Sequence, residues 1–189
     1  MRPIANTRSA AGIPTGRLAV WWVLASEIVI FGGLLASYIM HRLAHDAWTA
    51  QAANTNTWIG AFNTLVLLTS SLSAVLAHQA AVKGDGPKAA RLLYATVIGA
   101  GTFAIVKAFE WSTEISHGYT ITSSTFWSFY YTAAGLHALH VIGGVVILMI
   151  IATQARKQRE LHRVELIGIY WHFVDVVWIF LFPLLYIAK

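Results

Sequence analysis

Seven of the ionisable side chains that lie within otherwise apolar stretches of the sequence are candidate functional residues. They are Glu27, Lys107, Glu110, His137, His140, His172 and Asp175. An ionisable group inside a membrane-spanning segment is costly, so it usually faces protein or water and not lipid. Carboxylates and imidazoles at such a depth can relay protons, ligate a metal or heme, or form hydrogen bonds that hold helices together.

The ionisable residues recur at helical spacing, three, four or seven positions apart. The spaced sets are Lys107, Glu110 and Glu114; His137 and His140; and Glu165, His172 and Asp175. Residues at these spacings share one face of a helix. The pattern therefore predicts polar faces that turn inward in a helix bundle, with Lys107 and Glu110 nearer one membrane surface than the others.

The sequence gives only weak support to a metal or heme site. His137 and His140 could place two ligands on one ion, with His172 and Glu27 completing a set of four. However, the paired Glu-x-x-His motifs of a di-iron bundle are absent, and the chain has no cysteine for thiolate ligation. A bis-histidine heme would need histidines on facing helices, such as His140 and His172.

Two other roles for these residues stay open. Glu27, the histidines and Asp175 could form a proton path. Alternatively, the same residues could be buried polar contacts that fix helix packing, each worth about 1 kcal/mol or less. The packing role is favoured because such contacts recur in membrane bundles.

Composition places these residues inside a membrane protein. Hydrophobic residues make up 57% of the 189 residues and charged residues only 11%, whereas soluble domains average about 25% charged. The apolar blocks are long enough to cross a bilayer, which takes roughly 20 residues in a helix. The fold class expected is all-α: a polytopic bundle of five transmembrane helices. The five spans are expected near 18–40, 58–82, 91–113, 125–152 and 164–187.

Charge distribution predicts the orientation of the chain. Residues 1–17 are polar and are interpreted as a cytoplasmic tail, ahead of one transmembrane domain over 18–189. The tail and the second and fourth connections together carry ten basic residues, against Arg42 and Lys189 on the other side. Because cytoplasmic loops are enriched in Lys and Arg, the N-terminus should be cytoplasmic and the C-terminus periplasmic. The basic residues lie between apolar blocks, so a nucleic-acid partner is not expected.

Five sequence elements, in order, resemble subunit III of the heme–copper terminal oxidases. The last, Tyr170-Trp-His-Phe-Val-Asp-Val-Val-Trp178, is the most specific. The elements before it are Ser26-Glu27, which matches the serine–acidic pair of the family's carbodiimide-reactive helix; Asn63-Thr-Leu-Val-Leu-Leu-Thr-Ser-Ser71; Lys107-Ala-Phe-Glu-Trp111; and Gly135-Leu-His-Ala-Leu-His-Val141. The first two helices of the family's seven-helix form have no counterpart, so the chain is similar to the short five-helix form.

The resemblance implies an accessory subunit without a cofactor of its own. Heme and copper would lie in partner subunits: the catalytic subunit I, with subunit II in the complex. Subunit III of this family packs on subunit I, protects it from inactivation and supports proton uptake. Membrane lipids are further expected partners, and the resemblance leaves room for a bound phospholipid. The two missing helices contribute to a lipid-filled cleft in the longer form, so no lipid-contact residues are assigned.

The expected location is the bacterial cytoplasmic membrane, in a cytochrome c or quinol oxidase. A subunit III-like partner of nitric oxide reductase is an alternative that the motifs leave open. An independent small membrane transporter is a further alternative, although internal repeats and broken helices, which are typical of transporters, are not evident.

Overall fold

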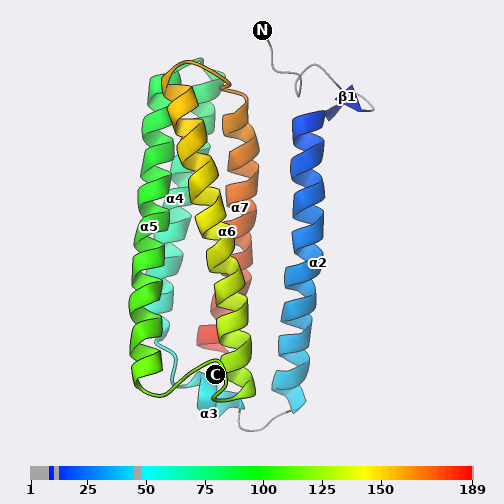
Figure 1. The fold of residues 1–189 in the computed structure, drawn as a ribbon, viewed down its shortest axis with the longest axis vertical. Coiled ribbons are helices and arrows are strands. Elements are labelled where there is room, and N and C mark those ends of the chain that lie inside the picture. Colours follow the sequence, from blue (N-terminus) through cyan, green and yellow to red (C-terminus); the bar gives the residue numbers. More distant parts are fainter. Residues whose placement is uncertain (1–8, 11–12, 45–47, 189) are drawn as a thin grey trace.

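The computed structural model of the protein describes residues 9–10, 13–44 and 48–188. Five helices in this part of the chain are long and apolar enough to cross a membrane, with mean hydropathies between 1.7 and 2.2. Figure 1 shows them lying side by side along one long axis. The all-α class and the five spans predicted from the sequence are confirmed.

The long helices have bounds wider than the apolar blocks alone. They are α2 (Thr15–Ala44), α4 (Thr57–Val82), α5 (Gly86–Ser116), α6 (Thr125–Arg156) and α7 (Arg163–Phe182), with α7 continued by a π-helical turn, η1 (Pro183–Ile187). A short helix, α3 (Trp48–Ala52), follows α2, and β1 (Ser9–Ala10) pairs antiparallel with β2 (Ile13–Pro14) before it. Each of the first four predicted spans lies within one of the long helices, and the fifth, 164–187, covers α7 together with η1.

The N-terminal helix begins inside the predicted tail. α2 starts at Thr15, three residues before the expected start of the first span. Part of the predicted tail, residues 1–8 and 11–12, lies outside the described residues, as does Lys189. The charge-based orientation and the division of the chain into tail and domain therefore remain predictions.

Side-chain caps fix where three of the helices begin. Asn56 Oδ1 accepts hydrogen bonds from the backbone N–H groups of Trp58 and Ile59 at the start of α4, at 3.1 and 3.2 Å. Asp85 caps α5 through Lys88 N–H at 3.0 Å, and Ser124 caps α6. These side chains satisfy N–H groups that have no partner within the helix. The tight α4–α5 turn also places Gly84 at φ +77°, a conformation that glycine adopts without strain.

Helices α4 to α7 form one bundle, and α2 stands to one side of it (Figure 1). Small residues allow α4 and α5 to approach closely: Ala74, Ala77 and Ala80 on α4 and Ala89 on α5 are almost fully buried. Close backbone approach through small residues is how helices associate in lipid, where no hydrophobic force drives them together. The Ser73 hydroxyl adds a 2.7 Å hydrogen bond to the hydroxyl of Thr96 across this interface.

Three polar contacts spaced along α2 attach it to the bundle. Arg17 pairs with Glu165 at 2.5 Å near the start of both helices. Glu27 Oε2 lies 3.0 Å from His140 Nε2 near mid-length. Toward the other end, the Tyr38 hydroxyl donates to the Leu184 carbonyl of η1 at 2.6 Å. These contacts position Glu27 against the bundle.

Gly144 of α6 provides the space that Trp171 of α7 fills. A Cβ atom at position 144 would meet Trp171 Cζ3 at 2.9 Å and Tyr170 Cε1 at 3.2 Å. We therefore expect Gly144→Ala to destabilise the bundle by about 1–3 kcal/mol through overpacking. Gly143→Ala is the matched control, because a Cβ there meets nothing within 4 Å. Thermal denaturation of both variants in the same lipid nanodiscs measures the difference, and equal midpoints would contradict the packing of Trp171 on α6.

Candidate functional site

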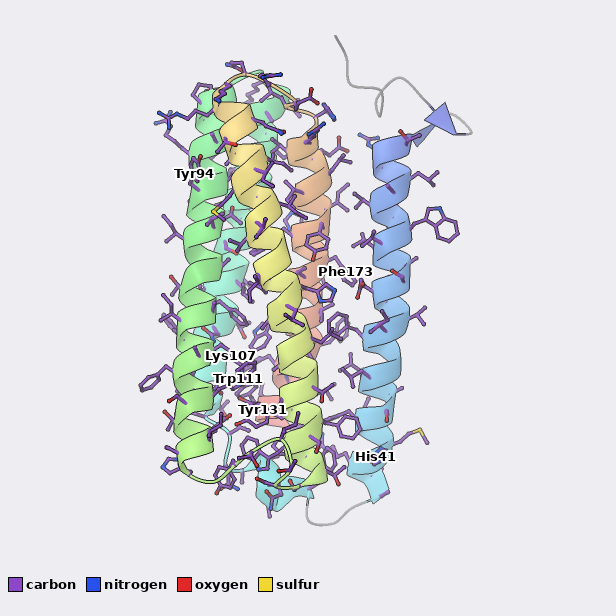
Figure 2. The ribbon with its side chains drawn as sticks, viewed as in Figure 1. His41, Tyr94, Lys107, Trp111, Tyr131 and Phe173 are labelled. Carbon is purple, nitrogen blue, oxygen red and sulfur yellow. The ribbon has the colours of Figure 1, made fainter. Side chains whose placement is uncertain are left out.

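A group of buried polar side chains surrounds Lys107 of α5. Lys107, Glu110 and Glu114 are 2%, 2% and 6% exposed, and Tyr130 of α6 and Tyr186 of η1 are fully buried. We call these five residues the Lys107 cluster. Figure 2 places Lys107 and Trp111 toward the α5–α6 loop end of the bundle, with Tyr131 of α6 across from them.

Three hydrogen bonds from Lys107 connect α5, α6 and η1. Its Nζ donates to Glu110 Oε2 at 3.0 Å, to the Tyr130 hydroxyl at 2.9 Å and to the Tyr186 hydroxyl. Three donated bonds require an ammonium group. The rings of Tyr130 and Tyr186 also lie 4.7 and 5.0 Å from Nζ, as cation–π contacts require. The ammonium is therefore held by one carboxylate and by aromatic faces, and it does not reach the surface.

The Tyr130 hydroxyl connects the two carboxyl groups of the cluster. It lies 3.1 Å from Glu110 Oε1, 3.0 Å from Glu114 Oε1 and 3.0 Å from the Tyr186 hydroxyl. Glu114 Oε2 is buried and has no hydrogen-bond partner in the described structure. The cluster thus combines one cation, two acidic groups and two phenols away from solvent.

Glu27 and His140 form a second, separate polar contact, between α2 and α6. Their side chains are 16% and 18% exposed, and Glu27 Oε2 lies 3.0 Å from His140 Nε2. His140 Nδ1 lies 2.8 Å from the Leu136 carbonyl oxygen. Because a carbonyl oxygen can only accept, Nδ1 carries a hydrogen in this arrangement.

His172 and Asp175 of α7 face α4 together. His172 Nδ1 lies 2.5 Å from the Ser71 hydroxyl. Asp175 is 4% exposed and lies beside the same serine, but neither of its carboxylate oxygens is in hydrogen-bonding geometry with a partner in the described structure. Ser71 is therefore a direct hydrogen-bonding partner of His172, whereas it only lies near Asp175.

His137 occupies the centre of the bundle among aromatic rings. Its imidazole packs against Phe103 at 5.5 Å and Trp178 at 5.1 Å between ring centroids. Both ring nitrogens are buried and lack a hydrogen-bond partner among the described residues, as do both amide atoms of Asn63 on α4. His137 and His140 therefore do not act as a pair, although they are three residues apart.

The seven predicted site residues thus fall into separate groups. Lys107 joins Glu110, Glu27 joins His140, His172 and Asp175 share Ser71, and His137 lies among aromatic rings. Within the described residues, no group of three or more His, Asp or Glu side chains could hold a metal ion. The ligand set of Glu27, His137, His140 and His172 is therefore not assembled.

Sequence reasoning missed Tyr130 and Tyr186. Tyr130 lies seven residues before His137, so helical spacing places both on one inward face and could have identified it. Tyr186 follows Pro183 in η1, where the helix changes from α to π. That change alters the residue spacing, so an α-helical projection does not predict where the Tyr186 side chain lies.

The fold and the polar groups indicate the general class of this protein. This is a multi-pass membrane protein, a five-helix bundle with an intramembrane polar core. The family model described as "Cytochrome c oxidase subunit III" matches residues 10–189. The chain therefore belongs to the cytochrome c oxidase subunit III family, the accessory subunits of heme–copper oxidases.

Curated relatives agree with this assignment. The chain is 32% identical over 170 residues to "Cytochrome c oxidase subunit 3" of Thermostichus vulcanus, covering 87% of this chain and 83% of the relative. It is 34% identical over 175 residues to "Probable cytochrome c oxidase subunit 3" of Mycobacterium bovis, covering 90% and 85%. "Heme-copper oxidase subunit I+III" of Aeropyrum pernix is 30% identical over 183 residues, covering 91% of this chain and 22% of that protein.

The Glu27–His140 contact gives a functional prediction. Glu27→Gln keeps the size of the side chain but cannot ionise, whereas Glu27→Leu leaves His140 Nε2 without its polar partner, at about 1–3 kcal/mol. We expect proton pumping to survive in Glu27→Gln and the subunit to bind less tightly in Glu27→Leu. Proton-to-electron stoichiometry in vesicles containing the oxidase measures the first effect, and subunit occupancy measures the second. Loss of pumping in Glu27→Gln at full occupancy would make Glu27 an obligatory relay.

Proposed function

We propose that this chain is the non-catalytic subunit III of a proton-pumping heme–copper oxygen reductase in a bacterial cytoplasmic membrane. It would pack against the catalytic subunit I, in a complex with subunit II, and help to keep the catalytic subunit active during turnover. Heme and copper would reside in those partners. The electrons would come from cytochrome c or a quinol.

One structural observation carries the non-catalytic part of this proposal. Several polar side chains inside the spans contact one another within the bundle, as Lys107 does with Glu110, Tyr130 and Tyr186. They therefore hold helices together and do not line a ligand-sized polar cavity. By contrast, the outward faces of α2, α4, α5 and α6 carry large exposed apolar side chains, such as Val29, Leu65, Ile105 and Leu139. Such faces suit lipid or another membrane subunit.

The fused relative supports the assignment of the partner. The protein named "Heme-copper oxidase subunit I+III" contains a segment similar to 91% of this chain as 22% of its length. Fusion into one polypeptide keeps two segments in one complex at a high effective concentration. A separate subunit III would reach the same arrangement through its apolar faces.

Removal of the chain from the purified oxidase tests the proposed role. We expect the initial rate of oxygen reduction per heme to be largely preserved, because no redox centre is removed. Activity should then decline over repeated turnovers, and re-addition of the chain should prevent that decline. Immediate loss of all oxygen reduction would contradict a non-catalytic role, as would a rate of decline equal to that of the intact complex.

A further inference from the structure

The single hydrogen of the Tyr130 hydroxyl faces both carboxyl groups of the Lys107 cluster. The hydroxyl oxygen lies 3.1 Å from Glu110 Oε1 and 3.0 Å from Glu114 Oε1, and a phenol has only one hydrogen to donate. With both carboxyl groups ionised, one of these two contacts would join two oxygens with no hydrogen between them, a repulsive arrangement at a buried site.

The charges of the cluster also indicate that it holds one added proton. One ammonium and two ionised carboxylates would leave a net charge of −1 among side chains that are 2%, 2% and 6% exposed. An unbalanced charge within a membrane-spanning bundle is strongly disfavoured. One added proton makes the cluster neutral and also supplies a hydrogen for the second contact between Tyr130 and a carboxyl oxygen.

Geometry identifies the carboxyl group that holds this proton. Glu110 contacts the Lys107 ammonium through Oε2 and Tyr130 through Oε1, so both of its oxygens accept hydrogen bonds as a carboxylate. Glu114 contacts Tyr130 at 3.0 Å through Oε1 and also lies beside the Tyr131 hydroxyl, but in the described structure it makes no salt bridge with a cation. The carboxyl group without direct contact with the cation is the one that gains least from ionising.

We propose that the Lys107 cluster is a proton-binding site, in which Glu114 holds one exchangeable proton opposite the Lys107–Glu110 ion pair. Proton binding forms an O–H bond on the Glu114 carboxyl group, and release returns the proton to water. Glu114 lies in the last turn of α5, which ends at Ser116, so exchange takes place at the α5–α6 loop end of the bundle. The site is distinct from the Glu27–His140 contact and does not depend on the proposed oxidase function.

The groups that determine this equilibrium come from three elements. Lys107 and Glu110 are on α5, Tyr130 and Tyr131 are on α6, and Tyr186 is on η1. The Tyr131 hydroxyl donates to the Tyr119 carbonyl at 2.8 Å. Tyr119 N–H in turn donates to the backbone carbonyl of Glu114 at 3.0 Å. This link ties the loop after α5 to the helix end that carries Glu114.

Infrared spectroscopy of the full-length chain in lipid nanodiscs tests the proposal, because the chain has only eight Asp and Glu side chains. Labelling with glutamate carrying ¹³C at the side-chain carboxyl group distinguishes Glu114 from Asp175. At neutral pH we expect a protonated-carboxyl C=O band that shifts with the label, responds to D₂O and is lost in Glu114→Gln. The control is Glu165→Gln, which removes a partly exposed carboxyl group paired with Arg17 and should leave the band in place.

The same comparison in the intact complex is a control for misfolding of the isolated chain. The difference spectrum between wild-type oxidase and the Glu114→Gln oxidase should contain the same labelled band. Absence of a label-sensitive carboxyl band in the wild type, or a band unchanged by Glu114→Gln, would show that Glu114 is ionised and would overturn the proposal. A band lost only in Glu27→Gln would assign the proton to the Glu27–His140 contact and would equally overturn it.

Discussion

Replacement of Lys107 by methionine is expected to destabilise the bundle by about 3–5 kcal/mol, because it leaves a buried carboxylate without its cation. Methionine has a similar length, so the change removes the charge and three hydrogen bonds more than it removes volume. Glu110, Tyr130 and Tyr186 would all lose their shared donor. Denaturation of the variant in nanodiscs of fixed lipid composition measures the free energy of unfolding.

The double variant Lys107→Met, Glu110→Gln separates charge from packing. It removes both members of the ion pair, so no unpaired charge remains, and replacement of a whole buried pair is often tolerated. We expect the double variant to recover a large part of the stability that the single variant loses. If the double variant is as unstable as Lys107→Met, the loss would come from packing around Lys107 and not from its charge.

Replacement of Trp178 by alanine is the second change with a large expected effect, about 3–5 kcal/mol for deletion of a fully buried aromatic side chain. Trp178 is 1% exposed, and its Nε1 donates to the Thr64 hydroxyl at 2.9 Å. Its ring packs on Phe103 at 4.9 Å and His137 at 5.1 Å between centroids. The side chain therefore joins α4, α5, α6 and α7 in one layer.

Trp58→Ala is the matched control for this prediction. It deletes the same side chain at a position that is 86% exposed, near the start of α4, where a tryptophan serves as an interfacial anchor. We expect its unfolding free energy to change much less than that of Trp178→Ala. Similar losses in the two variants would mean that depth in the bilayer, and not packing in the bundle, determines the contribution of tryptophan.

The five helices could be predicted from the sequence because the signal for each is long and strong. A run of roughly 20 apolar residues has few structural outcomes other than a membrane span. The helix starts were less accessible. α5 begins at Gly86, capped by Asp85, although its span was expected only from 91. α2 begins at Thr15, because Thr15 to Arg17 continue the helix beyond its apolar part.

The candidate site was less predictable, because helical spacing identifies a face and not the partner on another helix. The shared face of Lys107 and Glu110 followed from their i, i+3 spacing on α5. The contact between Glu27 and His140 depends on how α2 docks against α6, and spacing within one helix says nothing about that. The aromatic surroundings of His137 were likewise inaccessible, since they combine side chains from α5 and α7.

Co-purification of the chain from its native membrane tests the central claim most directly. A chain tagged at one terminus should be captured in mild detergent, and the captured material should be examined by absorption spectroscopy and peptide mass spectrometry. We expect a heme–copper catalytic subunit in near-stoichiometric amount, with heme bands that disappear when harsher detergent separates the chain from that subunit. Capture of the chain without a heme–copper subunit under conditions that keep the oxidase intact would contradict the account, as would heme that stays with the separated chain.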